Sequence, residues 1–149
     1  FQNLSPGEHQ LTFKVWDINN NSTTQTLNFI VKDETNQNLI VNKLLNWPNP
    51  FTSKTYVQFE HNCDDILDVN VQIYTITGKL VKTISTSVTA EPFYQGFRTP
   101  RTAIEWDGKD DFGDAVGKGT YIFKIFAKSQ NQDKCKGSAT AVEKMVILK

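Results

Sequence analysis

Seven short apolar runs, punctuated by Gly, Pro and Asn, are the feature that most constrains how this chain can fold. Val, Ile, Thr and aromatic residues, which favour strands, are common, and no window has a helical period long enough to bury a helix. This pattern is typical of an antiparallel Greek-key sandwich. The sequence therefore predicts an all-β fold with seven strands, at 39–46, 55–61, 67–75, 80–86, 103–106, 120–127 and 141–148.

Another pair of alternating runs precedes these seven. Leu11, Phe13 and Val15 alternate with polar residues, and the Asn-rich stretch 17–22 separates them from a second run at 27–31. The pattern predicts a β-hairpin over 1–33, followed by a linker at 34–38 and the sandwich domain at 39–149. Two strands alone are only marginally stable in water. We therefore expect the hairpin to end an upstream sandwich domain, or to pair with a second copy and give a homodimer.

Charge and length exclude several classes of function. The chain has 16 basic and 16 acidic residues, so its formal net charge is zero. This balance argues against a nucleic-acid partner, which usually needs a basic excess. No apolar stretch approaches the length of a membrane span. The chain opens at Phe1 without a Met, so we expect a fragment whose upstream part carries any export signal and the main activity.

The last six residues form an apolar run bracketed by charges. Such a run must pair within a sheet or offer an open edge to a partner. Recognition of an open edge would combine strand pairing with side-chain pockets. The sequence therefore predicts a partner-binding segment consisting of Lys144, Met145, Val146, Ile147, Leu148 and Lys149.

A second candidate for binding lies in the long stretch 85–102, which has no clear strand. Aromatic residues beside Arg are typical of binding hot spots. They could equally fold over the end of the sandwich and shield its core. Both interpretations stay open for Phe93, Tyr94, Phe97 and Arg98.

The chain contains one pair of residues that resembles a cysteine-peptidase site. His61 and Cys63 are two positions apart, so on one strand they share a face. A nucleophile also needs an orienting third group, and the sequence favours a surface His and a strand-end Cys instead. We expect no catalytic residue and no cofactor in this chain. Cys63 and Cys135 could form one disulfide or remain two free thiols, and both alternatives stay open.

Two further clusters have ordinary structural interpretations. Asp107, Asp110, Asp111 and Asp114 share a Gly-rich loop, and calcium takes such oxygens, but their spacing is not that of an EF-hand. We expect no metal there, and expect Asp107 to bind amides of its own loop. Trp47 and Trp106 are expected to cap the core rather than to form a sugar-binding platform.

The turn motifs resemble one family when they are taken in order. These motifs are Pro48-Asn49-Pro50-Phe51, Gly78-Lys79-Leu80-Val81, Trp106-Asp107-Gly108, Gly119-Thr120-Tyr121 and the closing Lys144-Met145-Val146-Ile147. Together they resemble the C-terminal sorting domain of the type IX secretion system, and also the Ig-like domain of flagellar hook-capping proteins. The start of the chain, with Leu4-Ser5-Pro6-Gly7 and Phe13-Lys14-Val15-Trp16-Asp17, is similar to the end of the Ig-like domain behind a gingipain-type cysteine peptidase.

The resemblance implies a non-catalytic domain that directs or retains its parent at the outer membrane. The implied parent is the cell-surface sortase of type IX secretion, a gingipain-like cysteine peptidase whose nucleophile lies upstream of Phe1. The implied partners are the outer-membrane shuttle barrel PorV and the secretion machinery. One alternative is a cargo-binding accessory domain of the peptidase, and another is a flagellar-type Ig-like scaffold.

Overall fold

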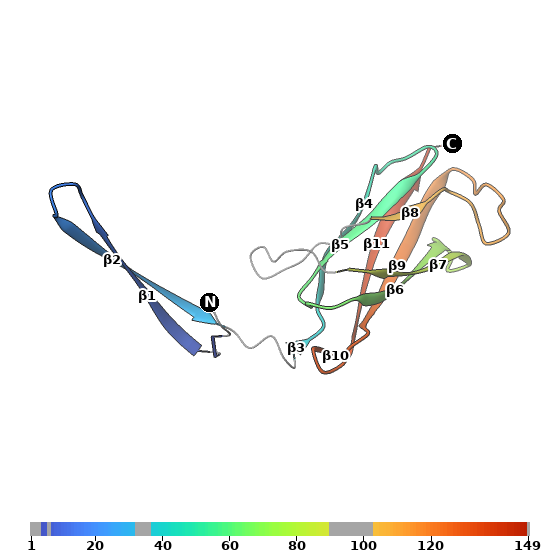
Figure 1. The fold of residues 1–149 in the computed structure, drawn as a ribbon. Helices are drawn as coiled ribbons and strands as arrows, with labels where there is room; N and C mark the ends of the chain where they lie inside the picture. The colour runs from blue at the N-terminus through green and yellow to red at the C-terminus, as the bar shows by residue number, and fades with distance from the viewer. Residues whose placement is uncertain (1–3, 6, 32–36, 90–102, 149) are drawn as a thin grey trace. The chain divides into compact units, whose positions relative to one another are not determined.

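The structure is a computed structural model that describes residues 4–5, 7–31, 37–89 and 103–148. The chain divides into two compact units, Phe1–Glu34 and Thr35–Lys149 (Figure 1). Within the described residues the regular structure consists of strands. None of it is a helix long and apolar enough to cross a membrane.

Unit 1 is an antiparallel hairpin of β1 (Gly7–Trp16) and β2 (Ser22–Val31). Its turn is held by Asp17, whose carboxylate accepts the amides of Asn19 and Asn21 at 2.9 Å each. The predicted hairpin is thus present. One face carries most of its apolar side chains, among them Phe13 and Leu27, which remain 51% and 54% exposed, and Trp16 and Ile30 stand exposed on the other face. The hairpin therefore does not bury its apolar face within its own unit.

Unit 2 contains two packed antiparallel sheets, and the predicted all-β, Ig-like sandwich is confirmed. One sheet has the order β11-β9-β6-β7 and the other has the order β4-β5-β8. All seven predicted strands are present. Their observed bounds are β4 Val41–Trp47, β5 Thr55–His61, β6 Leu67–Thr75, β7 Leu80–Val88, β8 Ile104–Trp106, β9 Gly119–Ser129 and β11 Ser138–Ile147.

The core lies between these sheets and follows from the alternation within each strand. β9 is the clearest case, because every second side chain from Tyr121 to Ser129 is buried and those between are exposed. β5 and β6 bury alternate residues in the same way. The side chains with less than 2% exposure include Val57, Phe59, Leu67, Val71, Ile73, Trp106, Phe123, Ile125, Met145 and Ile147.

Part of the segment 34–38, which was predicted to be a linker, is a strand. Gln37–Asn38 form β3, which pairs in parallel with β10 (Cys135–Lys136). The Leu39 amide extends the ladder by donating to the Lys136 carbonyl at 3.0 Å. The sequence did not predict this short strand because its residues are polar. Backbone pairing, rather than an apolar face, holds it in place.

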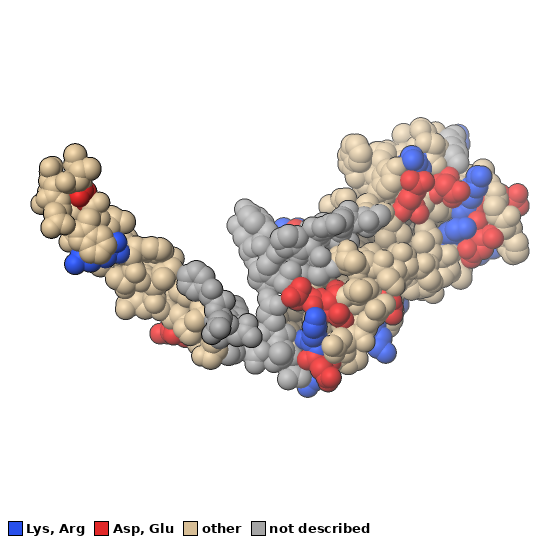
Figure 2. All heavy atoms as spheres, viewed as in Figure 1, with Lys and Arg blue, Asp and Glu red and all other residues tan. Residues whose placement is uncertain are grey.

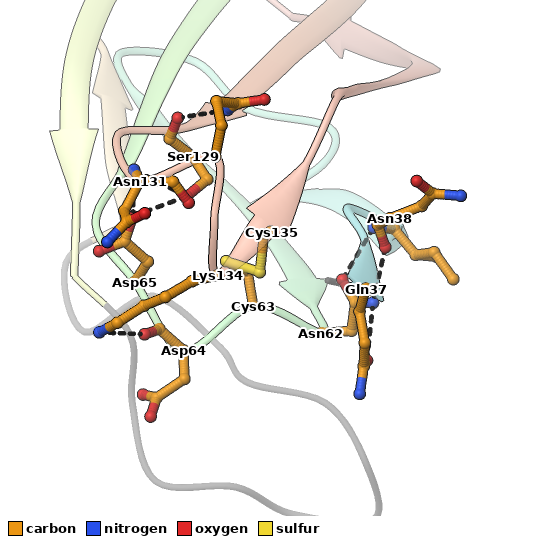
Figure 3. Close-up of a disulfide and its surroundings, with 12 residues drawn as sticks. Gln37, Asn38, Asn62, Cys63, Asp64, Asp65, Ser129, Asn131, Lys134 and Cys135 are labelled. Atoms are coloured by element: carbon orange, nitrogen blue, oxygen red, sulfur yellow. Dashed lines mark hydrogen bonds between the residues drawn. A yellow bond between two sulfur atoms is a disulfide. The ribbon is translucent and has the colours of Figure 1, made fainter. Parts of the chain in front are cut away.

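The two cysteines are joined in the structure. The Cys63–Cys135 disulfide joins the segment that follows β5 to strand β10, and the two cysteines lie 72 positions apart in the sequence (Figure 3). Around it, the Asn62 side chain donates to the Asn38 carbonyl at 2.9 Å and accepts the Ile40 amide at 2.8 Å. The disulfide and Asn62 together attach the start of unit 2 to its sandwich.

Two expectations about single side chains are wrong. His61 is fully buried rather than on the surface, and its ring lies 5.9 Å from that of Phe59. Trp47 is 70% exposed and does not cap the core, because the alternation of β4 buries its neighbour Asn46 instead. Trp106 does cap the core, with 1% exposure.

Candidate recognition surface

The sandwich has two opposite ends, and they carry different sequence motifs. At one end, here the motif end, β4 finishes at Trp47, β6 at Thr75 and β11 at Ile147, and β9 begins at Gly119. At the other, here the disulfide end, β5 finishes at His61 and β10 carries Cys135. The turn motifs quoted above all lie at the motif end.

The terminal strand is paired along both of its edges near the chain end. One edge of β11 pairs with β9, from Ser138↔Lys128 to Ile147↔Gly119. On the other edge the Phe51 amide donates to the Val146 carbonyl at 3.0 Å, and the Leu148 amide donates to the Phe51 carbonyl at 2.9 Å. The segment therefore does not offer the open edge that strand addition requires.

The Asn49 side chain adds two hydrogen bonds to this second edge of β11. Its side-chain amide donates to the Lys144 carbonyl at 3.3 Å, and its side-chain oxygen accepts the Val146 amide at 3.0 Å. Because an Asn side chain carries both a donor and an acceptor, it substitutes here for one residue of a paired strand. The Pro-Asn-Pro-Phe motif is thus the segment that closes the edge of β11.

The described residues of the predicted terminal segment divide between the buried and the exposed side of β11. Met145 and Ile147 are core residues with 0% and 1% exposure, and Val146 is half-buried. Lys144 is exposed and Leu148 is 60% exposed. Lys149 lies outside the described residues. Of the described part of the segment, Lys144 and Leu148 are the residues that could meet a partner.

A cluster of aromatic rings lies beneath the motif end. The Trp106 ring packs edge-to-face against Phe51, with centroids 5.6 Å apart, and against Tyr121 at 6.0 Å. The Trp106 indole donates to the Lys109 carbonyl and the Tyr121 hydroxyl donates to the Gly117 carbonyl, each at 2.8 Å. Three of the motifs thus converge on one buried contact, which fixes the loops of this end.

The Asp-rich loop has a structural role. Asp107 accepts the Lys109 amide at 3.1 Å, as predicted, and Asp110 accepts the amides of Phe112 and Asp114 at 2.9 Å each. Asp111 contacts the outer edge of β7, where its amide donates to Val81 and its carboxylate accepts the Thr83 amide, each at 3.2 Å. In the part of the chain that the structure describes, no group of three His, Cys, Asp or Glu side chains is placed to hold a metal.

Several large apolar side chains stand exposed in the segments around the motif end. The sequence predicted only Leu148 among them as a partner-binding residue, and it predicted that Trp47 would cap the core. The others lie in turns or at a strand end, where an apolar residue has no periodic pattern to reveal it. They are Trp47, Ile76 and Phe112, with 70%, 68% and 93% exposure. The other sequence candidates, Phe93, Tyr94, Phe97 and Arg98, lie outside the described residues.

Ion pairs stand on both sheets of unit 2, and on the four-stranded sheet Lys82 of β7 pairs with Asp111 at 3.6 Å. On the three-stranded sheet, Lys43 pairs with Glu60 at 3.0 Å and Lys54 pairs with Glu105 at 3.2 Å. Figure 2 shows basic and acidic side chains side by side on the face it presents.

One carboxylate at the disulfide end has a shifted pKa. Burial raises the pKa of Asp65, but hydrogen bonds from Ser129 and from the Asn131 amide lower it by more, so the pKa lies below its ordinary value.

This fold and its motifs correspond to a known class of protein domain. Residues 45–94 match the family model described as the secretion system C-terminal sorting domain. This match runs from β4 through β7 and includes the Asn49 and Phe51 contacts with β11. The predicted resemblance to a type IX sorting domain is thus confirmed. The matched family is a sorting domain rather than a catalytic one.

Among solved structures, the chain is similar to PorU. A solved structure described as dimeric latent PorU from Porphyromonas gingivalis is 26% identical to this chain, with a TM-score of 0.61. The match covers 97% of this chain and 12% of that chain, so this chain spans a small part of the PorU length. No curated protein matches the sequence.

Proposed function

We propose that this chain is the C-terminal part of a PorU-like protein, and that unit 2 directs that protein to the cell surface and retains it at the outer membrane. The observation that carries the proposal is the match of residues 45–94 to the sorting-domain family, within a likeness to PorU that covers 97% of the chain. The parent would be a gingipain-like cysteine peptidase that acts as a sortase, with its catalytic residues upstream of Phe1. This chain would contribute no catalytic group.

In this proposal the partners are the barrel proteins of the type IX system, with PorV as the shuttle barrel. The motif end is the part of unit 2 that we propose they contact. Its exposed Trp47 and Leu148 lie on segments joined through the Phe51 contacts, and exposed aromatic and aliphatic anchors of this kind supply most of the energy of many protein interfaces. The buried rings below would keep those segments rigid, which lowers the entropy cost of binding.

A display experiment tests the proposal. A reporter with an export signal and this full chain at its C-terminus is expressed in a bacterium with type IX secretion, and surface reporter is measured by protease shaving. We expect surface display with the chain and periplasmic retention without it. A reporter that stays in the periplasm with the chain attached would contradict the proposal.

Point variants locate the contact within the chain. Trp47→Ser with Leu148→Ser should reduce display, because it removes two exposed anchors while leaving the core intact. Ile66→Ser is the matched control, since Ile66 is 41% exposed beside Leu67 at the disulfide end. Deletion of 144–149 is a poorer test, because it also removes the buried Met145 and Ile147. Normal display of the double variant would exclude the motif end as the contact.

The role proposed for the hairpin follows from its exposed apolar face. Its exposed apolar face needs a cover, which we propose is the rest of an Ig-like domain upstream in the parent. A homodimer through the hairpin stays the alternative, and the related PorU structure is described as dimeric. The cargo-binding alternative relies on residues 93–98, which lie outside the described residues. The sorting-domain match favours secretion over the flagellar alternative.

A further inference from the structure

The outward side of the four-stranded sheet differs from an ordinary solvent-facing sheet. The solvent face of an antiparallel sheet is normally polar. Here the central strand β9 exposes Ile122, Lys124, Phe126 and Lys128 in succession. Ile122 is 36% exposed and Phe126 is 42% exposed. We call this side the outer face, meaning the outward side chains of β6, β7, β9 and β11.

The register joins these side chains into one patch. Ile122 lies between Lys144 on β11 and Tyr74 on β6, and Lys124 lies beside Val142, which is 58% exposed. Side chains opposite one another in an antiparallel pair lie about 5 Å apart, so these side chains are near neighbours along the row. The exposed apolar residues therefore belong to one patch, in which they alternate with lysines.

Two of the three lysines in this patch have no acidic side chain opposite them. Lys124, Lys128 and Lys144 stand on the outer face, whereas Asp68 is its one acidic side chain on the strands described. Asp68 accepts hydrogen bonds from Ser87 and Gln130 at 2.8 Å each, and it lies directly opposite Lys128, so that lysine has an acidic neighbour on the same face. The opposite sheet pairs its lysines with Glu60 and Glu105. A chain of zero net charge thus carries two lysines on this face, Lys124 and Lys144, that have no acidic side chain opposite them.

A hollow lies beside Phe126 on the same face. Its volume is about 430 Å³, and Phe126 lines it together with Asp68, Asn70, Ser85, Ser87 and Lys128. Lipid surfaces are met by apolar side chains that project from a protein. A hollow with an aromatic wall and hydroxyl or amide groups at its rim suits an inserted side chain of a protein partner.

We propose that the outer face binds a protein surface that presents carboxylates around an apolar anchor, with the anchor in the hollow beside Phe126 and the carboxylates on Lys124 and Lys144. The lysines would raise the association rate and reject basic surfaces, while Ile122, Phe126 and Val142 supply buried area. This inference rests on the proposed function, because it adds a second contact surface for the partner that a displayed protein meets. It does not involve Trp47 or the Leu148 anchor.

Site-specific photocrosslinking tests the contact. Val142 is replaced by a photocrosslinking amino acid in the full protein in its own cells, and Gln58, exposed on β5, receives the same replacement as the matched control. We expect an adduct with a protein from position 142, with Asp or Glu in the crosslinked peptide, and little adduct from position 58. An adduct with lipid only, or equal protein adducts from both positions, would overturn the inference.

Charge reversal then tests the chemistry. Lys124→Glu with Lys144→Glu should lower the position-142 adduct by about tenfold, because it replaces attraction by repulsion. Lys43→Glu with Lys54→Glu makes the same change of net charge on the opposite sheet and should leave the adduct within about twofold. Both variants should unfold within several degrees of the parent protein, since all four side chains are exposed and the two ion pairs that the second variant breaks contribute about 0–1 kcal/mol each. An unchanged adduct in the first variant contradicts the inference.

The same cells separate this inference from the proposed function. A protein that reaches the surface and gives a position-142 adduct insensitive to Lys124→Glu and Lys144→Glu refutes only the outer-face contact. A protein that gives the sensitive adduct but stays in the periplasm refutes the sorting function and supports the contact. Loss of display in the Trp47 and Leu148 variant, with the adduct retained, supports the two surfaces as independent.

Discussion

Asn49 shows how one side chain can determine whether a strand edge is open. From sequence, Pro48-Asn49-Pro50-Phe51 is a segment that leaves a ladder, because Pro lacks an amide donor. The structure adds that the Asn49 side chain pairs with Lys144 and Val146 at the far end of the chain. Local pattern cannot reveal a contact across this separation, since it depends on how the two sheets pack.

Replacing Asn49 tests its role. Asn49→Ala removes two hydrogen bonds to β11, which should lower the free energy of unfolding by about 1 kcal/mol. The amide of Val146 should then exchange faster with solvent, while that of Met145, bonded within the ladder to β9, should not. Asn42→Ala, at an exposed position of β4, is the control. Unchanged exchange at Val146 would show that Asn49 does not close this edge.

Asp65 provides a prediction about pH at the same scale. Its pKa lies below the ordinary value despite burial, because Ser129 and the Asn131 amide donate to the carboxylate at 2.6 and 2.7 Å. A depressed folded-state pKa contributes stability that is present above the unfolded pKa, about 3.9, and is lost as pH falls through the folded value.

The comparison with Asp65→Asn isolates that contribution. The difference in unfolding free energy between the parent protein and Asp65→Asn should be constant above about pH 5 and should shrink as the pH falls below about 4. Denaturant titrations at a series of pH values measure it. A difference that is independent of pH down to about pH 2 would show that the carboxylate is not stabilised in the folded state.

At the scale of elements, the sequence predicted what depends on alternation. The seven sandwich strands and the hairpin follow from apolar residues at every second position, so they could be located to within a few residues. β3 and β10 have no apolar period, and the disulfide depends on proximity, so neither could be derived. Trp47 was misplaced because the bulge between Asn42 and Leu45 changes which side chains of β4 face inward.

The disulfide supports a prediction for the elements that it joins. Cys63→Ser with Cys135→Ser should lower the free energy of unfolding by about 4 kcal/mol, because the bridge closes a loop of 72 residues in the unfolded chain. The amide of Leu39 should lose protection first, since it bonds to Lys136 next to Cys135. Denaturation with and without reductant measures the effect, and the double variant itself should not respond to reductant. Equal stability of both proteins would contradict this account.

At the scale of the whole molecule, the two units bury their side chains to different extents. Unit 2 encloses a core of residues such as Phe123 and Ile125, both with 0% exposure. Unit 1 leaves Phe13, Val15 and Leu27 more than half exposed. The pattern of polar and apolar residues predicted both units and also that the hairpin needs a cover, and the exposures identify the side chains that such a cover would bury. Stability in this chain should therefore be concentrated in unit 2.

Hydrogen exchange of the whole chain tests this difference. Amides of β1 and β2 should exchange orders of magnitude faster than those of β6 and β9, because a two-stranded hairpin is only marginally stable without a packed face. The difference should hold at low protein concentration. If hairpin protection rises with concentration while that of β9 does not, a second copy covers the apolar face, as the homodimer alternative requires. Strong protection at every concentration would instead mean that the hairpin is stable alone, and would remove the need for any cover.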